Sequence, residues 1–146
     1  MPPPLQVSSR VRVRATPERV WQVAMDWSRQ GEWIPATDVS GGTGIGAQVA
    51  ARTALGPVGF TDTMVITEWD PPRRCVVRHT GRVVRGSGIF EVVPQGEYTE
   101  FRWTELIELP VPAAARPAAV PLARWTVVPA TRLALDYALR RFARLV

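Results

Sequence analysis

The sequence predicts an α+β fold in which a curved antiparallel β-sheet of about seven strands wraps around a long C-terminal helix. Strand-like segments follow one another at hairpin spacing between residues 47 and 109, which is typical of an antiparallel sheet. Helical patterns lie outside this block, after the first strand and at the C-terminus, and such segregation favours α+β over α/β architecture. At 146 residues, the chain 1–146 is expected to form a single domain.

The chain begins with a predicted strand followed by two helices. Residues 5–14 alternate between apolar and polar positions, which indicates a half-buried strand. Thr16 is suited to cap a helix, and Pro17 is suited to its first position. A short second helical segment near residues 28–33 is expected to end at Pro35. Residues 1–4 are expected to be disordered.

The middle of the chain supplies the remaining strands. A glycine-rich segment at 41–46 precedes them, and it is interpreted as a turn because a nucleotide-binding glycine loop needs a long helix after it. Between the strands lie turn signals such as Gly56-Pro57. The predicted strands are residues 47–54, 58–69, 75–80, 83–93 and 98–109.

The last part of the chain is expected to form the long helix. Residues 110–128 are rich in proline and alanine and are interpreted as a linker or a proline-broken helical lead-in. Pro129 is expected to open the final helix, which carries an apolar stripe that includes Leu135 and Leu139.

Composition excludes several kinds of chemistry. The sequence has no lysine, so it has no Schiff-base, pyridoxal phosphate or P-loop lysine. Its single cysteine, Cys75, cannot form a disulfide within the chain, and its single histidine, His79, excludes multi-histidine metal sites. We therefore expect no metal and no cofactor. No apolar run approaches a membrane span, and the N-terminus lacks a signal-peptide pattern, so a cytoplasmic location is expected.

The net charge is +5, because the chain has 18 arginines, no lysine and 13 acidic residues. The arginines are scattered along the whole chain, so we interpret them as a reflection of genome composition and expect no nucleic-acid partner. The exposed row Arg10, Arg12 and Arg14 leaves open a basic interaction module for an anionic partner.

Several segments resemble, in order, the START-type, polyketide cyclase/dehydrase-like (SRPBCC) superfamily with its helix-grip fold. Residues 15–21 (Ala-Thr-Pro-Glu-Arg-Val-Trp) resemble the opening of that family's first helix, and residues 26–35 resemble its close. Residues 67–74 resemble a hairpin turn of the family, and residues 86–94 and 98–110 resemble its last two strands. The resemblance implies a cavity between the concave face of the sheet and the C-terminal helix. Members bind lipids, sterols, polyketides, hormones or quinones, and some catalyse cyclisation or dehydration.

Regular strand alternation predicts which side chains face such a cavity. Trp21 and Trp27 are expected to pack the first helix. For Trp33 and Trp103, the sequence is compatible with two roles, packing in the core and stacking on a flat ligand. The candidate ligand-binding residues are Trp33, Phe60, Asp62, Met64, Val77, His79, Phe90, Trp103, Glu105, Leu135 and Leu139. Among them, Glu105, Asp62 and His79 are the candidate catalytic residues, because inward-facing titratable groups are where acid/base chemistry is found. Each has an alternative structural role in an ion pair or a hydrogen bond.

Three functions follow from these observations. The preferred one is binding of a hydrophobic small molecule, such as a lipid, a polyketide or an aromatic metabolite, by a monomer or homodimer. The alternative is a cyclase or dehydratase that uses Glu105, Asp62 or His79 as acid or base. The second alternative is the basic interaction module. A carboxylate and His79 within hydrogen-bond reach inside a closed pocket would favour the enzyme, whereas both groups at the surface would exclude it. Salt-dependent binding of nucleic acid is expected only for the third function.

Overall fold

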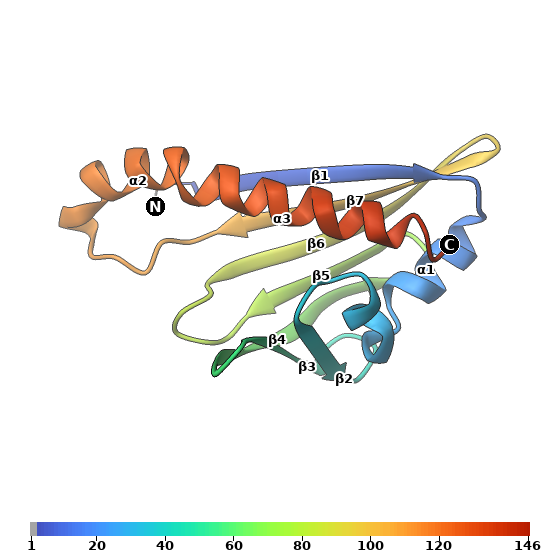
Figure 1. The fold of residues 1–146 in the computed structure, drawn as a ribbon, viewed down its shortest axis with the longest axis horizontal. Coiled ribbons are helices and arrows are strands. Elements are labelled where there is room, and N and C mark those ends of the chain that lie inside the picture. Colours follow the sequence, from blue (N-terminus) through green and yellow to red (C-terminus); the bar gives the residue numbers. More distant parts are fainter. Residues whose placement is uncertain (1–2) are drawn as a thin grey trace.

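A computed structural model describes residues 3–146 and has the predicted α+β architecture (Figure 1). All seven strands form one antiparallel sheet in the order β1-β7-β6-β5-β4-β3-β2, so that β1 and β2 are its edges. The sheet curls around the long C-terminal helix as in the helix-grip fold. The strands are β1 (Leu5–Val13), β2 (Thr37–Gly41), β3 (Gln48–Leu55), β4 (Val58–Asp70), β5 (Arg74–His79), β6 (Gly86–Gln95) and β7 (Tyr98–Ile107).

The expected N-terminal disorder lies partly outside the described residues, because the structure does not describe residues 1–2. Pro3 and Pro4 are exposed and have no regular secondary structure. Within the described residues, no helix is long and apolar enough to cross a lipid bilayer.

The first two helices begin and end as their sequence predicts. Helix α1 (Pro17–Ala24) has proline at its start, and the hydroxyl oxygen of Thr16 accepts a hydrogen bond from the backbone N–H of Arg19 at 3.2 Å. This is the side-chain cap that threonine gives to the first turn of a helix. The 3-10 helix η1 (Trp27–Glu32) follows directly and ends before Pro35.

The proline-rich segment contains helix rather than an extended linker. A 3-10 turn η2 (Ala113–Ala115) leads into α2 (Arg116–Trp125), and α3 (Val127–Phe142) follows after Thr126. The sequence placed the start of the final helix at Pro129, two residues too late. Proline is tolerated there because backbone N–H groups in the first turn have no partner within the helix.

The glycine-containing region also holds a strand whose residues the sequence did not indicate. Strand β2 pairs with β3 from Thr37↔Thr53 to Gly41↔Val49, and the two threonine hydroxyls lie 3.0 Å apart. Its residues Thr-Asp-Val-Ser-Gly have weak strand propensity apart from valine and threonine, so pairing with β3 provides what local preference does not.

A β-bulge in β4 determines which of its side chains face inward. Ile66 pairs with Val77, but Glu68 pairs with Val76, so one extra residue is inserted at Thr67. Beyond this point the alternation is reversed, which brings Trp69 inward against Trp21, with ring centroids 5.0 Å apart. The bulge comes after the segment 60–66, and the predicted inward face of that segment is therefore unchanged.

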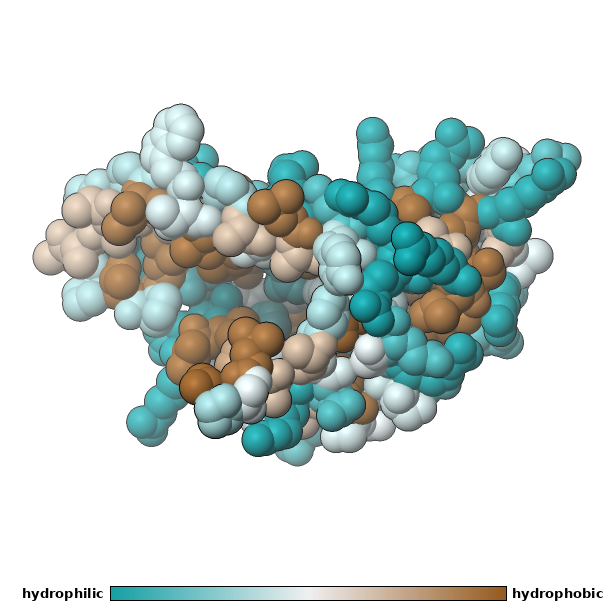
Figure 2. Space-filling view, viewed as in Figure 1, coloured by the Kyte–Doolittle hydropathy of each residue, from teal (hydrophilic) through white to brown (hydrophobic). Residues whose placement is uncertain are grey.

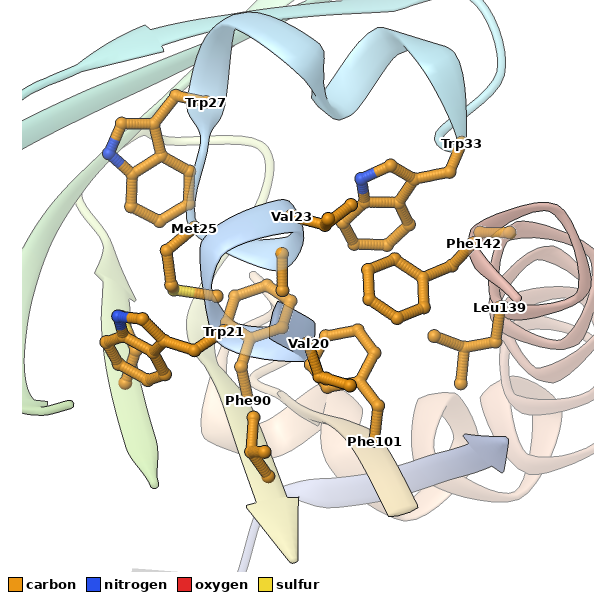
Figure 3. Close-up of a cluster of buried hydrophobic side chains, with 14 of the residues drawn as sticks. Val20, Trp21, Val23, Met25, Trp27, Trp33, Phe90, Phe101, Leu139 and Phe142 are labelled. Carbon is orange, nitrogen blue, oxygen red and sulfur yellow. The ribbon is translucent and has the colours of Figure 1, made fainter. Parts of the chain in front are cut away.

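The core lies between α1, η1, α3 and the β1–β7–β6 half of the sheet. Trp33 at the end of η1 points toward Phe142 on α3, with ring centroids 5.2 Å apart (Figure 3). Phe101 on β7 completes the group, 6.0 Å from Trp33 and 4.6 Å from Phe142. In addition, the guanidinium of Arg141 donates a hydrogen bond to the carbonyl oxygen of Glu32 at 3.0 Å. Helix α3 is thereby fixed to η1 and to the sheet.

Two leucines on α3 provide a matched test of this packing. Leu139 is 1% exposed, and Leu133 is 68% exposed on the same helix. We expect Leu139→Ala to lower the free energy of unfolding by about 2–5 kcal/mol, because it removes buried methyl groups and leaves a cavity. Leu133→Ala is expected to change it by less than about 0.5 kcal/mol. Urea denaturation measures both, and equal effects would contradict this placement of α3.

Candidate functional site

A small cavity lies against the concave face of the sheet, on the half that α3 does not cover. Its volume is about 180 Å³, and its lining is mostly apolar. Strands β2 to β7 and η1 provide nearly all of its wall. The lining residues are Trp27, Gln30, Ile34, Thr37, Val39, Val49, Ala51, Thr53, Phe60, Asp62, Met64, Val77, His79, Val84, Phe90, Trp103 and Glu105.

Eight of the eleven residues expected to contact a ligand line this cavity. The other three, Trp33, Leu135 and Leu139, lie in the core instead. Trp33 is fully buried against Phe101, Trp103 and Phe142 rather than at the pocket mouth. Among the described residues, none of those lining the cavity belongs to α3. The cavity is therefore enclosed by the sheet and η1, not by the sheet and the C-terminal helix.

The three candidate catalytic residues come together in one hydrogen-bonded cluster at the cavity wall. Nδ1 of His79 lies 2.8 Å from Oδ2 and 3.0 Å from Oδ1 of Asp62. Nε2 of His79 lies 3.4 Å from Oε2 of Glu105. The indole N–H of Trp103 donates a hydrogen bond to Oε1 of Glu105 at 2.7 Å. The His79 side chain is 6% exposed, and the two carboxylate side chains are 14% and 16% exposed.

Sheet register explains how residues distant in the sequence meet here. His79 is paired with Met64 on β4, so Asp62 lies two residues further along the same inward face. Gly88 on β6 stands between Val77 and Glu105 in the cross-strand row. A Cβ atom at Gly88 would lie only 3.1 Å from Oε1 of Glu105 and 3.1 Å from Cγ2 of Val77. Because Gly88 has no side chain, the Glu105 carboxylate can occupy the space beside it on the inward face of the sheet.

The two carboxylates keep the imidazole of His79 protonated. Burial by itself lowers the pKa of His79, but the hydrogen bonds to Asp62 and Glu105, together with their negative charges, outweigh burial and raise the pKa to about 9. At neutral pH, His79 is therefore an imidazolium ion whose two N–H groups both donate to carboxylates. Such a group cannot serve as a general base at neutral pH, because both ring nitrogens already carry a proton.

The cluster has distinct chemical properties on its two sides. The Nδ1 side is firmly bound by both oxygens of Asp62, whereas the Nε2 contact with Glu105 is long for a charged pair. The carboxylates can accept further hydrogen bonds, because each ionised carboxylate has about four acceptor sites. The wall of the cavity thus offers hydrogen-bond acceptors, and a net negative charge, to a bound molecule.

Three further placements complete the description of the site. Trp27, predicted to be a helix-packing residue, is buried and also lines the cavity, and its indole N–H donates to the carbonyl oxygen of Gly42 at 2.8 Å. The indole N–H of Trp33 is buried and has no hydrogen-bond partner within residues 3–146. In the same part of the chain, no group of three or more His, Cys, Asp or Glu side chains has the geometry to hold a metal ion.

Nine lining residues were not among the candidates from the sequence. Five of them are the inward positions of β2 and β3. Recognition of strand β2 would have indicated Thr37 and Val39, and alternation along the predicted strand 47–54 would have indicated Val49, Ala51 and Thr53. Trp27, Gln30 and Ile34 come from η1 and the turn after it, where no periodic pattern indicates an inward face. Val84 lies in the loop before β6.

The basic row on β1 is partly occupied by contacts within the molecule. The guanidinium of Arg12 lies 4.9 Å above the ring of Tyr98, and Arg14 lies 3.6 Å from the carboxylate of Glu97. Both contacts are at the surface, where such pairs contribute little.

Since His79 is the only histidine, its titration can be followed directly by proton NMR. We expect a midpoint of about 9 instead of the ordinary 6.5, and a lower midpoint in Asp62→Asn, which removes one negative partner. Glu91→Gln is the matched control, because the carboxylate of Glu91 pairs with Arg74 at 3.0 Å outside the cavity. This variant should leave the titration midpoint of His79 unchanged. A wild-type midpoint at or below 6.5 would contradict the buried cluster.

The same shift predicts how stability depends on pH. A pKa raised in the folded state contributes stability that is fully present below pH 6.5 and is lost as the pH rises through about 9. The difference in free energy of unfolding between wild type and His79→Gln should therefore shrink between these values. Urea titrations across this range measure it, and a difference that grows with pH would exclude the proposed protonation state.

Comparisons with known proteins agree with the observed fold. Residues 4–146 match the family model described as "Polyketide cyclase / dehydrase and lipid transport". No curated protein matches the sequence. Among solved structures, the protein TTHA0849 from Thermus thermophilus is 19% identical, with a TM-score of 0.76, over 96% of this chain and 95% of that one.

Two other solved structures show the same fold. The Polyketide_cyc-like protein Cgl2372 from Corynebacterium glutamicum is 18% identical, with a TM-score of 0.60, over 99% of this chain and 93% of that one. The Aha1 dimer from Colwellia psychrerythraea is 17% identical, with a TM-score of 0.57, over 92% of this chain and 98% of that one. At these identities the likeness extends to the fold alone. The family match over nearly the whole length shows that the chain belongs to the polyketide cyclase/dehydrase and lipid transport family.

Proposed function

We propose that the protein binds a compact hydrophobic molecule in the cavity, with a hydrogen-bond donor of the ligand directed at Asp62 or Glu105. The observation that carries the proposal is a mostly apolar cavity with a buried, negatively charged cluster in its wall. Apolar walls provide affinity, and a few placed polar groups fix the orientation of a ligand.

The size of the cavity limits the class of ligand. A volume of about 180 Å³ is close to that of a protein cavity of about 150 Å³ that binds benzene, and it is below the roughly 300–1,000 Å³ of pockets for drug-sized molecules. Of the ligand classes expected from the sequence, a one- or two-ring aromatic metabolite therefore fits better than a whole lipid. The proposal requires no cofactor, and it keeps the cytoplasmic location and the monomer or homodimer expected from the sequence.

A matched pair of fluorescent probes tests this proposal. We expect 2-naphthol, which donates a hydrogen bond, to bind about tenfold more tightly than 2-methoxynaphthalene, which cannot, because a hydrogen bond to a charged group contributes about 1.5–3 kcal/mol. Glu105→Gln and Asp62→Asn should each reduce this preference, whereas Glu91→Gln, outside the cavity, should retain it. Fluorescence titration gives the dissociation constants. Absence of binding by both probes, or a preference unchanged in both cavity variants, would refute the proposal.

The hydrogen-bonded cluster also favours a second candidate function, acid/base catalysis of the cyclase or dehydratase type. In this alternative, Asp62 orients the imidazolium, and a substrate carbonyl displaces Glu105 from the longer contact and accepts the Nε2 proton. An enol then forms as a carboxylate removes the α-proton.

Exchange of the α-protons of benzoylacetone into heavy water, followed by NMR, tests the catalytic alternative. Catalysis predicts that the protein accelerates this exchange and that His79→Gln abolishes the acceleration. Equal exchange with and without protein would leave binding as the only supported function.

A further inference from the structure

Large apolar side chains are exposed at one end of the molecule, beside the cavity. Trp125 at the end of α2 is 84% exposed, and Leu122 one turn earlier is 64% exposed. Across the opening, the β3–β4 hairpin exposes Leu55 and Val58, both at 72%, and the loop before β6 exposes Val83 at 77%. Figure 2 shows apolar surface over α2 and the adjoining part of α3 and over the β3–β4 hairpin, on both sides of a hollow. Exposed apolar groups gathered in this way are typical of an interaction surface.

The sheet register places these segments at the same end of the fold. Leu55 and Val58 close the β3–β4 hairpin, and Leu5 and Gly86 both pair with Ile107 at the corresponding end of β1, β6 and β7. Helix α2 joins them there, because its Arg116 and Val120 line a groove together with Leu5 and Ile107. Figure 1 shows α2, the β5–β6 loop and the β3–β4 hairpin at this end. We call it the α2 end.

The α2 end is also basic. Residues 80–90 and 109–135 contain no acidic residue, and the hairpin 54–59 contains no charged residue. Within the described residues, none of the arginines in these two segments forms an ion pair. Glu108 at the end of β7 lies nearby, and it is 3.8 Å from Arg78. The unpaired arginines of the α2 end are Arg82, Arg85, Arg116 and Arg124, whereas Arg132 lies further along α3 in a groove that it shares with Glu91 and Asp136.

This combination distinguishes between possible occupants of the surface. A symmetric dimer through the α2 end would bring the same arginines from both copies together, with only Glu108 of each copy, which already lies 3.8 Å from Arg78, to offset their charge. Nucleic acid would satisfy the arginines, but the aliphatic side chains of Leu122, Leu55 and Val83 have no favourable partner in a phosphate backbone. An anionic bilayer satisfies both, since tryptophan and aliphatic side chains enter the interface while arginines meet the lipid phosphates.

We propose that the α2 end docks on the surface of an anionic lipid bilayer. Trp125 and Leu122 on one side and the β3–β4 hairpin on the other enter the interfacial layer. Phe60 and Val84 line the cavity and are close in sequence to Val58 and Val83, so docking would turn the cavity toward the lipid. Docking itself requires no occupied cavity, and failure of either proposal is therefore separate from failure of the other.

Co-sedimentation with vesicles tests the proposal on the whole chain. We expect binding to vesicles of equal parts phosphatidylcholine and phosphatidylglycerol, little binding to phosphatidylcholine alone, and weaker binding at high salt. The double variant Leu122→Ser/Trp125→Ser should lose at least about tenfold in affinity, because it removes two interfacial apolar groups. Ile45→Ser is the apolar control, since Ile45 is 74% exposed in the β2–β3 turn, at the opposite end of β3 from Leu55.

A pair of charge variants with equal net charge isolates the arginines. Arg82→Gln/Arg124→Gln should weaken binding by about fivefold per arginine, whereas Arg19→Gln/Arg144→Gln, outside the α2 end, should not. All four arginines are exposed, and circular dichroism verifies that each variant folds.

Three results would overturn the proposal. The first is no binding to the anionic vesicles, and the second is an equal loss in the test and control variants. The third is a dimer, detected by light scattering, that Leu122→Ser/Trp125→Ser dissociates while vesicles remain unbound.

Discussion

The fold depends on one constraint, which is that a single helix is too narrow to cover a curled seven-stranded sheet. Helix α3 packs on the β1–β7–β6 side through Leu139 and Phe142, and Trp33 fixes η1 against it. The concave face of the remaining strands is covered at one end by α1, whose Trp21 packs against Trp69 on β4, and otherwise by η1, which lacks the length to fill it. The cavity is the space that this incomplete cover leaves. Substitutions of Trp33, Phe101 or Phe142 should therefore affect the cavity indirectly, through the position of η1.

The cavity wall then has its own electrostatic requirement. A charged imidazole that is only 6% exposed is tolerated only with partners that offset the loss of hydration, and Asp62 and Glu105 provide them. Two carboxylates around one cation leave an excess of acceptors, which a ligand with a donor can use. Because the imidazolium is held on both sides, the same geometry that favours the binding proposed above makes His79 a poor general base. Catalysis would require a substrate to open the longer contact with Glu105.

Much of this arrangement could be predicted because most strands obey regular alternation. The inward placement of Asp62, His79 and Glu105 follows from it, since the β4 bulge at Thr67 comes after Asp62 and neither β5 nor β7 is irregular at the site. Where propensity and packing differ, the sequence was insufficient. Strand β2 forms through pairing with β3 despite weak local preference. The positions of Leu135 and Leu139 in the core, rather than at the cavity, depend on how α3 crosses the sheet, which no local pattern encodes.

The most direct test of the central claim is a crystal structure of the protein purified from its own host without added ligand. The account predicts density for a compact apolar molecule in the cavity, with a donor atom within hydrogen-bond distance of Asp62 or Glu105. Side chains collapsed into the cavity, or a His79 ring turned away from both carboxylates toward solvent, would contradict it.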